Sequence, residues 1–305
     1  MPQDRLLPPV ATLQAYRRVH GRPEAWRPAL EVICQRHGLP PGSHRLTRVG
    51  SHVVALRPGQ TVVKLYCPLF PEDHQVESRV LRHLQGQSLV PVPEIRAEGQ
   101  LEGWPYLLLS FLEGQPLEHL WKDLSQLDQE RIGRQLGEDL VGWHQISSRG
   151  IEDLGPVWGT FLEDRVEDAV ARQRAHGWGE VWLGKLPSFL DQLDLSRMVS
   201  PRPTLLHADL TGEHLLMQPA AHGHQVAGLI DWADSMIGHG EYDLVALCVD
   251  AVGCHGPAQR QALETPLGAT APKLQPAILP QSQAVASWPF SVNGASTANW
   301  QELTC

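Results

Sequence analysis

Cysteine is scarce in this chain of 305 residues, and long apolar runs are missing from it. The five cysteines are an odd number with no CxxC spacing, which argues against a disulfide framework or a zinc ribbon. No run of about 18 apolar residues is found, and the first residues lack the apolar core of a secretory signal. We therefore expect a soluble, cytoplasmic protein with no membrane partner.

Positive charge is also in short supply. The chain has 25 Lys and Arg against 34 Asp and Glu, a formal net charge of −9, and no basic stripe. This balance argues against a nucleic-acid binder and against a protein held on an anionic membrane. The acidic excess is largest in residues 201–250, where Arg202 is the only Lys or Arg. Hydrophobic residues make up 42% of the chain, which is enough for a folded core.

The first part of the chain predicts a small antiparallel sheet with accompanying helices. Apolar residues at helical spacing favour a helix over 24–37, and the run RPGQ at 57–60 is typical of a tight turn between two strands. We expect strands over residues 45–49, 53–56, 61–66, 94–98 and 106–111, and a second helix over 72–84.

The middle of the chain has mainly helical patterns, from residue 117 to about 195. The strongest predicted helix is 128–146, whose apolar residues repeat every three or four positions. Short strands are expected over 204–207, 215–217 and 226–230. After residue 264 charge and periodicity almost disappear, which predicts a disordered or atypical tail.

These patterns together predict an α+β fold with two lobes. A chain of this length has room for two lobes and a core in each. The expected divisions are a helical extension over 1–44, a small antiparallel-sheet lobe over 45–112, a larger mainly helical lobe over 113–264, and the tail over 265–305.

Two carboxylates follow apolar strands in the most acidic stretch. Asp209 comes after the run LLHA, and Asp231 comes after GLI. The strand, loop and hairpin pattern between them places both at neighbouring strand ends. One such carboxylate can orient an attacking hydroxyl and accept its proton, while the other holds a divalent cation against nucleotide phosphates. A carboxylate at the end of an apolar strand is costly to bury without a cation, which favours Asp231 as the metal ligand.

The motif HADLTGEH at 207–214 and the segment IDWADSMIGHGEYDL from residue 230 resemble the aminoglycoside phosphotransferase and choline-kinase-like family. The resemblance spans roughly residues 46–247 and implies a protein-kinase-like fold with a small N-terminal lobe and a larger C-terminal lobe. It implies an ATP-dependent phosphotransferase in which Asp209 is catalytic and Asp231 holds Mg²⁺. Ala208, where protein kinases carry an arginine, fits a kinase that acts on small molecules.

The resemblance also assigns a nucleotide site in the first lobe. The residues expected to bind ATP are Gly50, Ser51, Lys64, Glu77, Ser110 and Leu112. Lys64, on the third strand, would contact the phosphates, and Glu77 on the following helix would hold it. Gly50 and Ser51 would cover the phosphates with backbone N–H groups. The backbone around Ser110 and Leu112 would contact the adenine. Taken alone, a strand lysine between apolar residues is more often a snorkelling surface residue.

One position departs from the family pattern. His214 stands where the family has a metal-binding asparagine. Magnesium prefers oxygen ligands, so imidazole is a poorer partner for it. Three outcomes remain open: His214 binds a softer ion such as Mn²⁺, Glu213 supplies the missing oxygen, or the site is weakened and the protein is a pseudokinase with a nucleotide-binding or regulatory role.

The phosphate acceptor is expected to be a small molecule with a hydroxyl group, and an aminoglycoside or another cationic metabolite would suit the family. The acidic residues between 163 and 168 form either a pocket for such a cation or a solvated helix face. The sequence carries no prediction of the oligomeric state.

Neighbouring polar residues have simpler readings. Three of them are expected to be structural, namely His144, His207 and Asp243. A different chemistry would use His207 and Asp209 with His239 or His255 as a two-histidine, one-carboxylate iron site. That site would need a many-stranded jelly roll, whereas this chain is helical on both sides of the motif.

Overall fold

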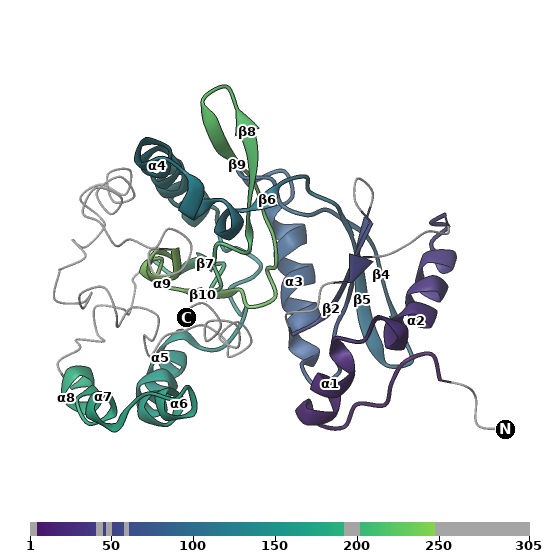
Figure 1. Cartoon of the computed structure of the whole chain (residues 1–305), viewed down its shortest axis with the longest axis horizontal. Helices are drawn as coiled ribbons and strands as arrows, with labels where there is room; N and C mark the ends of the chain where they lie inside the picture. The colour runs from purple at the N-terminus through teal and green to yellow at the C-terminus, as the bar shows by residue number, and fades with distance from the viewer. Residues whose placement is uncertain (1–4, 41–44, 47–50, 58–60, 192–201, 248–305) are drawn as a thin grey trace. The chain divides into compact units, whose positions relative to one another are not determined.

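The computed structural model of the chain describes residues 5–40, 45–46, 51–57, 61–191 and 202–247 (Figure 1). These residues form two compact units. The N-terminal unit contains the described residues up to 85 and residues 92–113, and the C-terminal unit contains residues 86–91 and the described residues from 114 onward. No helix within these ranges combines the length and the apolar character needed to cross a membrane.

The N-terminal unit is built on an antiparallel sheet of five strands in the order β1-β2-β3-β5-β4. The strands are β1 (Arg45–Leu46), β2 (Val53–Arg57), β3 (Thr61–Leu65), β4 (Ile95–Leu101) and β5 (Trp104–Ser110). In the sheet register Lys64 lies opposite Leu107 of β5. Because successive side chains of a strand point to opposite faces, Lys64 lies on one face of the sheet and Val63 and Leu65 lie on the other.

Helices cover both faces of this sheet. They are α1 (Leu13–His20), α2 (Pro23–Arg36) and α3 (Pro71–Leu84). The first two pack on the face of Val63 and Leu65, around Trp26 and Trp104, whose ring centroids are 5.3 Å apart. Figure 1 shows α3 on the other side of the sheet, where it contacts β5. Lys64 and α3 therefore share a face.

The sequence predicts α2 and α3 to within one residue at their starts, but it misses α1. The signal for α1 is small: the Thr12 hydroxyl accepts a hydrogen bond from the amide of Ala15, and Tyr16 is the one buried side chain of the helix. A short helix with a single buried residue leaves almost no apolar period to detect.

The C-terminal unit is mainly helical, as predicted. Its helices are the 3₁₀ turns η1 (Leu117–His119) and η2 (Trp121–Asp123), then α4 (Gln126–His144), α5 (Trp158–Glu167), α6 (Ala169–Ala175), α7 (Glu180–Leu183), α8 (Leu186–Leu190) and α9 (Glu241–Ala246). The long helix α4 starts two residues earlier than its apolar pattern because the Ser125 hydroxyl caps it, accepting from the amide of Asp128.

Two small sheets complete the C-terminal unit. One has three strands in the order β6-β8-β9, and the other pairs β7 with β10. The strands are β6 (Gln115–Pro116), β7 (Thr204–Leu206), β8 (Leu215–Ala220), β9 (Gly223–Leu229) and β10 (Met236–Gly238). Figure 1 shows α4 beside the β8–β9 hairpin, and the side chain of Gln135 accepts a hydrogen bond from the amide of Val226 there.

The α+β prediction is confirmed, since an antiparallel sheet dominates the first unit and helices dominate the second. The strands predicted near 204, 215 and 226 are present. Three predictions concern positions outside the described residues: Gly50 in the phosphate loop, His255 as an iron ligand, and the tail over 265–305.

Candidate functional site

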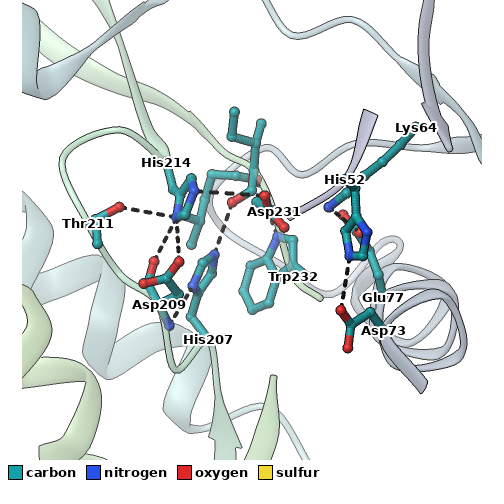
Figure 2. Close-up of polar contacts among 12 residues, drawn as sticks. His52, Lys64, Asp73, Glu77, His207, Asp209, Thr211, His214, Asp231 and Trp232 are labelled. Atoms are coloured by element: carbon teal, nitrogen blue, oxygen red, sulfur yellow. Dashed lines mark hydrogen bonds and ion pairs between the residues drawn. The ribbon is translucent and has the colours of Figure 1, made fainter. Parts of the chain in front are cut away.

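In the N-terminal unit, Lys64 and Glu77 form the predicted ion pair. The Lys64 ammonium donates to Glu77 Oε2 at 2.6 Å, and both side chains are almost fully buried (Figure 2). The Tyr66 hydroxyl donates to the same oxygen, also at 2.6 Å. Lys64 is buried and paired with Glu77, so it is not the snorkelling surface lysine that was the alternative interpretation of the sequence. The carboxylate is held from two sides, so its position is fixed by the sheet.

Tyr66 is a site residue that the sequence analysis missed. The available signal was its spacing: it lies two positions after Lys64, so both side chains leave the strand on the same face. Alternation along the strand therefore carried the information, but an aromatic residue on a strand is also an ordinary core residue.

The loop before β2 is anchored at its described end by His52. The His52 ring nitrogen Nε2 lies 3.0 Å from Asp73 Oδ2 of α3, and Nδ1 accepts from the amide of Cys67 at 3.4 Å. The backbone oxygen of His52 contacts Nε2 of His20 at 2.9 Å. Ser51, the predicted phosphate-covering residue, is half-buried immediately before this anchor.

Of the two residues predicted to contact adenine, Ser110 is the last residue of β5 and Leu112 lies just beyond the strand. Ser110 is tied to Glu94 in both directions: its amide donates to the Glu94 carbonyl, and its hydroxyl accepts from the Glu94 amide, both at 2.9 Å. Leu112, two residues on, is half-buried. The Ser110 amide is therefore already bonded within the N-terminal unit, and the adenine contact stays a prediction.

In the C-terminal unit, Asp243 holds the backbone of the loop that carries Asp209. The fully buried Asp243 carboxylate accepts from the amides of His207 at 3.0 Å and Ala208 at 2.8 Å. His144 contacts the same carboxylate at 3.1 Å. The predicted structural roles of His144 and Asp243 are thereby confirmed. Ala208 has a φ of 66°, a left-handed conformation that these bonds help to hold.

His207 is confirmed as a structural residue and not as a metal ligand. Its Nδ1 atom accepts from the amide of Asp209 at 3.3 Å, so Nε2 carries the proton and donates to the carbonyl of Ile230 at 3.0 Å. Burial lowers the pKa of His207 to about 4, which keeps the ring neutral. Both ring nitrogens are committed, and the fold is no jelly roll, so the iron-site alternative is wrong.

His214 lies between the two predicted functional carboxylates (Figure 2). Its Nδ1 atom is 2.8 Å from the backbone oxygen of Asp209 and 3.6 Å from Oδ2 of the same residue. Its Nε2 atom is 3.8 Å from Oδ2 of Asp231. Asp231 itself has a φ of 64° and follows β9, where the Ile230 amide donates to the His214 carbonyl at 3.0 Å. The loop therefore brings Asp209, His214 and Asp231 together, as the motif predicts.

The charge of His214 is set by these neighbours. Burial alone would lower its pKa, but the carboxylates of Asp209 and Asp231 outweigh burial and raise the pKa to about 9. Without a metal ion, the imidazolium is therefore the cation that balances this acidic loop. Glu213, the other candidate oxygen donor, is exposed to solvent.

These donors fit a transition ion better than magnesium. Nδ1 of His214 is taken by the Asp209 carbonyl, so only Nε2 faces Asp231, and a spacing of 3.8 Å is compatible with two ligands at about 2.1 Å from one ion. Across the described ranges no group of three His, Cys, Asp or Glu side chains has metal-site spacing. A nitrogen and one carboxylate do not supply the oxygen cage that magnesium prefers.

Comparisons with known proteins place these observations in a family. The profile of the phosphotransferase enzyme family matches residues 51–276. A comparison with curated protein sequences found no match.

Solved structures share the fold at low sequence identity. The GDP and kanamycin complex of APH(2'')-IIIa has a TM-score of 0.66 and 20% identity, over 80% of this chain and 83% of that chain. A macrolide 2'-phosphotransferase from Brachybacterium faecium has a TM-score of 0.58 and 21% identity, over 81% and 85%. An aminoglycoside phosphotransferase from Streptomyces rimosus has a TM-score of 0.61 and 16% identity, over 87% and 98%. The expected protein-kinase-like fold is confirmed.

Proposed function

Because this chain belongs to the phosphotransferase enzyme family, we propose that it transfers the γ-phosphoryl group of ATP to a hydroxyl group of a small molecule. The observation that carries the proposal is the loop in which Asp209 and Asp231 flank His214. Core packing alone does not call for two carboxylates at this place, whereas phosphoryl transfer needs one at the attacking hydroxyl and one at a cation. The relatives solved with GDP and with kanamycin support nucleotide and small-molecule binding by this fold.

Each residue then has a defined task. Asp209 orients the acceptor hydroxyl and takes its proton as the hydroxyl oxygen bonds to the γ-phosphorus and ADP leaves. Asp243 accepts hydrogen bonds from the amides of the two residues before Asp209, so the Asp209 carboxylate is positioned before the acceptor arrives. Lys64, held by Glu77, contacts the nucleotide phosphates.

Asp231 and Nε2 of His214 are the groups that would hold a divalent ion. When bound, such an ion would neutralise charge on the nucleotide phosphates. His214 must first give up a proton from Nε2, because an imidazolium has no lone pair for a metal. We propose Mn²⁺ as the better ion for this pair and Mg²⁺ as the weaker one, since His214 replaces an oxygen ligand.

Calorimetry and ATP turnover test this function. The full-length protein should bind ATP only together with a divalent ion, and more tightly with Mn²⁺ than with Mg²⁺. The Asp209→Asn variant should keep nucleotide binding and lose about 10²–10⁴-fold of the ATP turnover. Asp164→Asn, which changes an exposed carboxylate of α5, is the matched control. Absence of nucleotide binding with either ion would contradict the proposal.

The position of His214 favours a second candidate, a pseudokinase that binds nucleotide without turnover. A protonated His214 already balances Asp209 and Asp231, which leaves less need for a metal ion. In that case wild-type protein binds nucleotide but releases no ADP, and His214→Asn strengthens magnesium and nucleotide binding. ADP release by the wild type would eliminate this candidate.

A further inference from the structure

His52 is a buried polar residue to which the proposed function gives no task. It follows Ser51, the residue expected to contact the nucleotide phosphates through its backbone, and it is 2% exposed. An imidazole buried just before a strand is costly unless its nitrogens have partners, and an apolar side chain would fill the same space without that cost. The contacts of His52 therefore indicate what the residue does.

These contacts reach three separate parts of the N-terminal unit. Nε2 lies 3.0 Å from Oδ2 of Asp73 in the first turn of α3, which is ion-pair distance without hydrogen-bond alignment. Nδ1 accepts from the amide of Cys67, two residues beyond β3, so Nε2 carries the proton and faces the carboxylate. The backbone oxygen contacts Nε2 of His20, the last residue of α1.

The ring of His52 also packs against the residues that hold Lys64. In the sheet register Val54 lies opposite Lys64, so His52, two positions before Val54, is placed on the same face of the sheet. There its ring centroid lies 4.7 Å from that of Tyr66, whose hydroxyl donates to Glu77 Oε2. Figure 2 shows His52 beside Lys64 and Glu77. The described end of the loop and the lysine–glutamate pair thus belong to one buried group of side chains.

We propose that His52 is a positioning residue for the nucleotide phosphates, because it holds the backbone of Ser51 at a fixed place relative to Lys64. The inference rests on the proposed function. Backbone N–H groups bind an anion best when they are oriented before it arrives, since no further ordering is then needed. The side chain of His52 connects this backbone to Asp73 of α3. The same helix carries Glu77, so α3 sets the place of both groups that would contact phosphate.

A purely structural role for His52 predicts a different result. If the residue only fills the core, loss of its two nitrogens changes stability and affects every ligand of the nucleotide site alike. ATP and adenosine separate the two roles, because adenosine has the purine and the ribose of ATP but no phosphates. A loss of affinity confined to ATP identifies the phosphate contacts as the part that His52 positions.

Calorimetric titration of the full-length protein in the presence of Mn²⁺ tests the inference. His52→Phe keeps a ring beside Tyr66 and removes both nitrogens. Its Kd for ATP should rise about 3–10-fold, the equivalent of about one hydrogen bond, and its Kd for adenosine should stay within about twofold of the wild type. His52→Gln should recover part of the ATP affinity, because its amide nitrogen can donate toward Asp73.

A second variant and two controls keep the test decisive. Asp73→Ala changes a partly exposed residue and removes the same link, so it should weaken ATP binding like His52→Phe, and the double variant should be no weaker than either. Arg82→Met removes the ion pair with Glu98, a link between the other end of α3 and the sheet, and should keep the wild-type ATP affinity. Ile33→Val lowers stability from the opposite face of the sheet and should keep it too.

Three results would overturn the inference. They are an unchanged ATP affinity in both His52→Phe and Asp73→Ala, a parallel loss of ATP and adenosine affinity, and a loss of ATP affinity in the two controls of the same size as in His52→Phe. The last two would show that His52 acts through the general stability of the N-terminal unit. Absence of ATP binding by the wild type would count against the phosphotransferase function, so the two failures are distinguishable.

Discussion

At the scale of single residues, one carboxylate oxygen of the predicted nucleotide site accepts two short hydrogen bonds. Lys64 and Tyr66 both donate to Glu77 Oε2 at 2.6 Å. Tyr66 thereby positions Glu77, and Glu77 positions Lys64. Removal of the tyrosine hydroxyl deletes one hydrogen bond to a buried carboxylate, and such bonds contribute about 1.5–3 kcal/mol.

We expect Tyr66→Phe to lower the free energy of unfolding by about 1–3 kcal/mol and to raise the KM for ATP, since Lys64 is then held less firmly. Urea unfolding and steady-state kinetics measure the two effects. In a double-mutant cycle with Glu77→Gln the two changes should be strongly non-additive. Simple additivity would show that Tyr66 acts independently of Glu77.

His207 makes stability depend on acid. The pKa of His207 is about 4 in the folded protein and about 6.5 in an unfolded chain. Between these two pH values the unfolded state binds a proton at His207 and the folded state does not. The stabilisation is therefore complete above pH 6.5 and is lost as the pH falls toward 4, by at most about 3 kcal/mol.

The corresponding variant is His207→Gln, whose amide nitrogen can donate to Ile230 as Nε2 does. Urea unfolding between pH 7 and pH 4 should show a smaller loss of stability for the variant than for the wild type. An identical pH dependence for the two proteins would mean that His207 is not the group that titrates.

Single residues also show where sequence reasoning stops. Asp209, Asp231 and His214 could be found because a short motif carries them at fixed spacing. The burial of Arg165 in α5 could not be predicted, because a helix with four acidic neighbours looks solvated until the direction of each side chain is known. Tertiary packing decides which side chain of the helix points into the core. The spacing of apolar residues along the sequence predicts this direction poorly here.

At the scale of secondary-structure elements, the crossing of α5 over the β7–β10 pair depends on a glycine. A Cβ atom at Gly238 of β10 would lie 2.5 Å from Cε3 of Trp158 and 2.8 Å from Cδ1 of Leu206. The backbone of β10 can approach α5 this closely only without a side chain.

Gly238→Ala should therefore lower the free energy of unfolding by about 1–3 kcal/mol, the usual cost of overpacking. Gly159→Ala is the control, because nothing lies within 4 Å of a Cβ there and alanine favours the helix by about 0.5–1 kcal/mol. Denaturant unfolding should give opposite signs for the two variants. Equal effects would contradict the close approach.

Most elements could be predicted from local pattern, but their pairing could not. The sequence predicts a strand over 204–207, and β7 (Thr204–Leu206) lies there, whereas its partner β10 has three residues and no alternation to detect. Strand order in the first sheet likewise places β5 between β3 and β4, against the order of the chain. Long-range contacts decide such choices, and a local window contains none of them.

At the scale of the whole molecule, the described residues of the segment predicted as an extension over 1–44 share a core with the sheet that follows. Trp26 of α2 is fully buried, and Tyr16 of α1 lies 6.1 Å from Trp104 of β5 between ring centroids. The backbone amides of Leu6 and Leu7 also donate to the Glu102 carboxylate. The helices therefore cover one face of the sheet and are not an appendage.

A chain that begins at residue 45 should for that reason lose cooperative folding of the N-terminal unit, because the sheet would expose its apolar face to water. Circular dichroism during thermal unfolding and limited proteolysis would measure this against the full-length protein. Recovery of a soluble, cooperatively unfolding fragment would instead support 1–44 as a dispensable extension.

Trp232 follows Asp231 and is 1% exposed, with its ring centroid 4.6 Å from that of His207 and its indole N–H donating to the carbonyl of Leu229. Trp143 packs edge-on to it at 6.2 Å. An indole so close to a carboxylate and an imidazole emits light whose intensity and wavelength depend on the charge beside it. The protein thus carries its own fluorophore at the acidic loop, and the difference in emission between the wild type and a Trp232→Phe variant would report ligand arrival there without any added label.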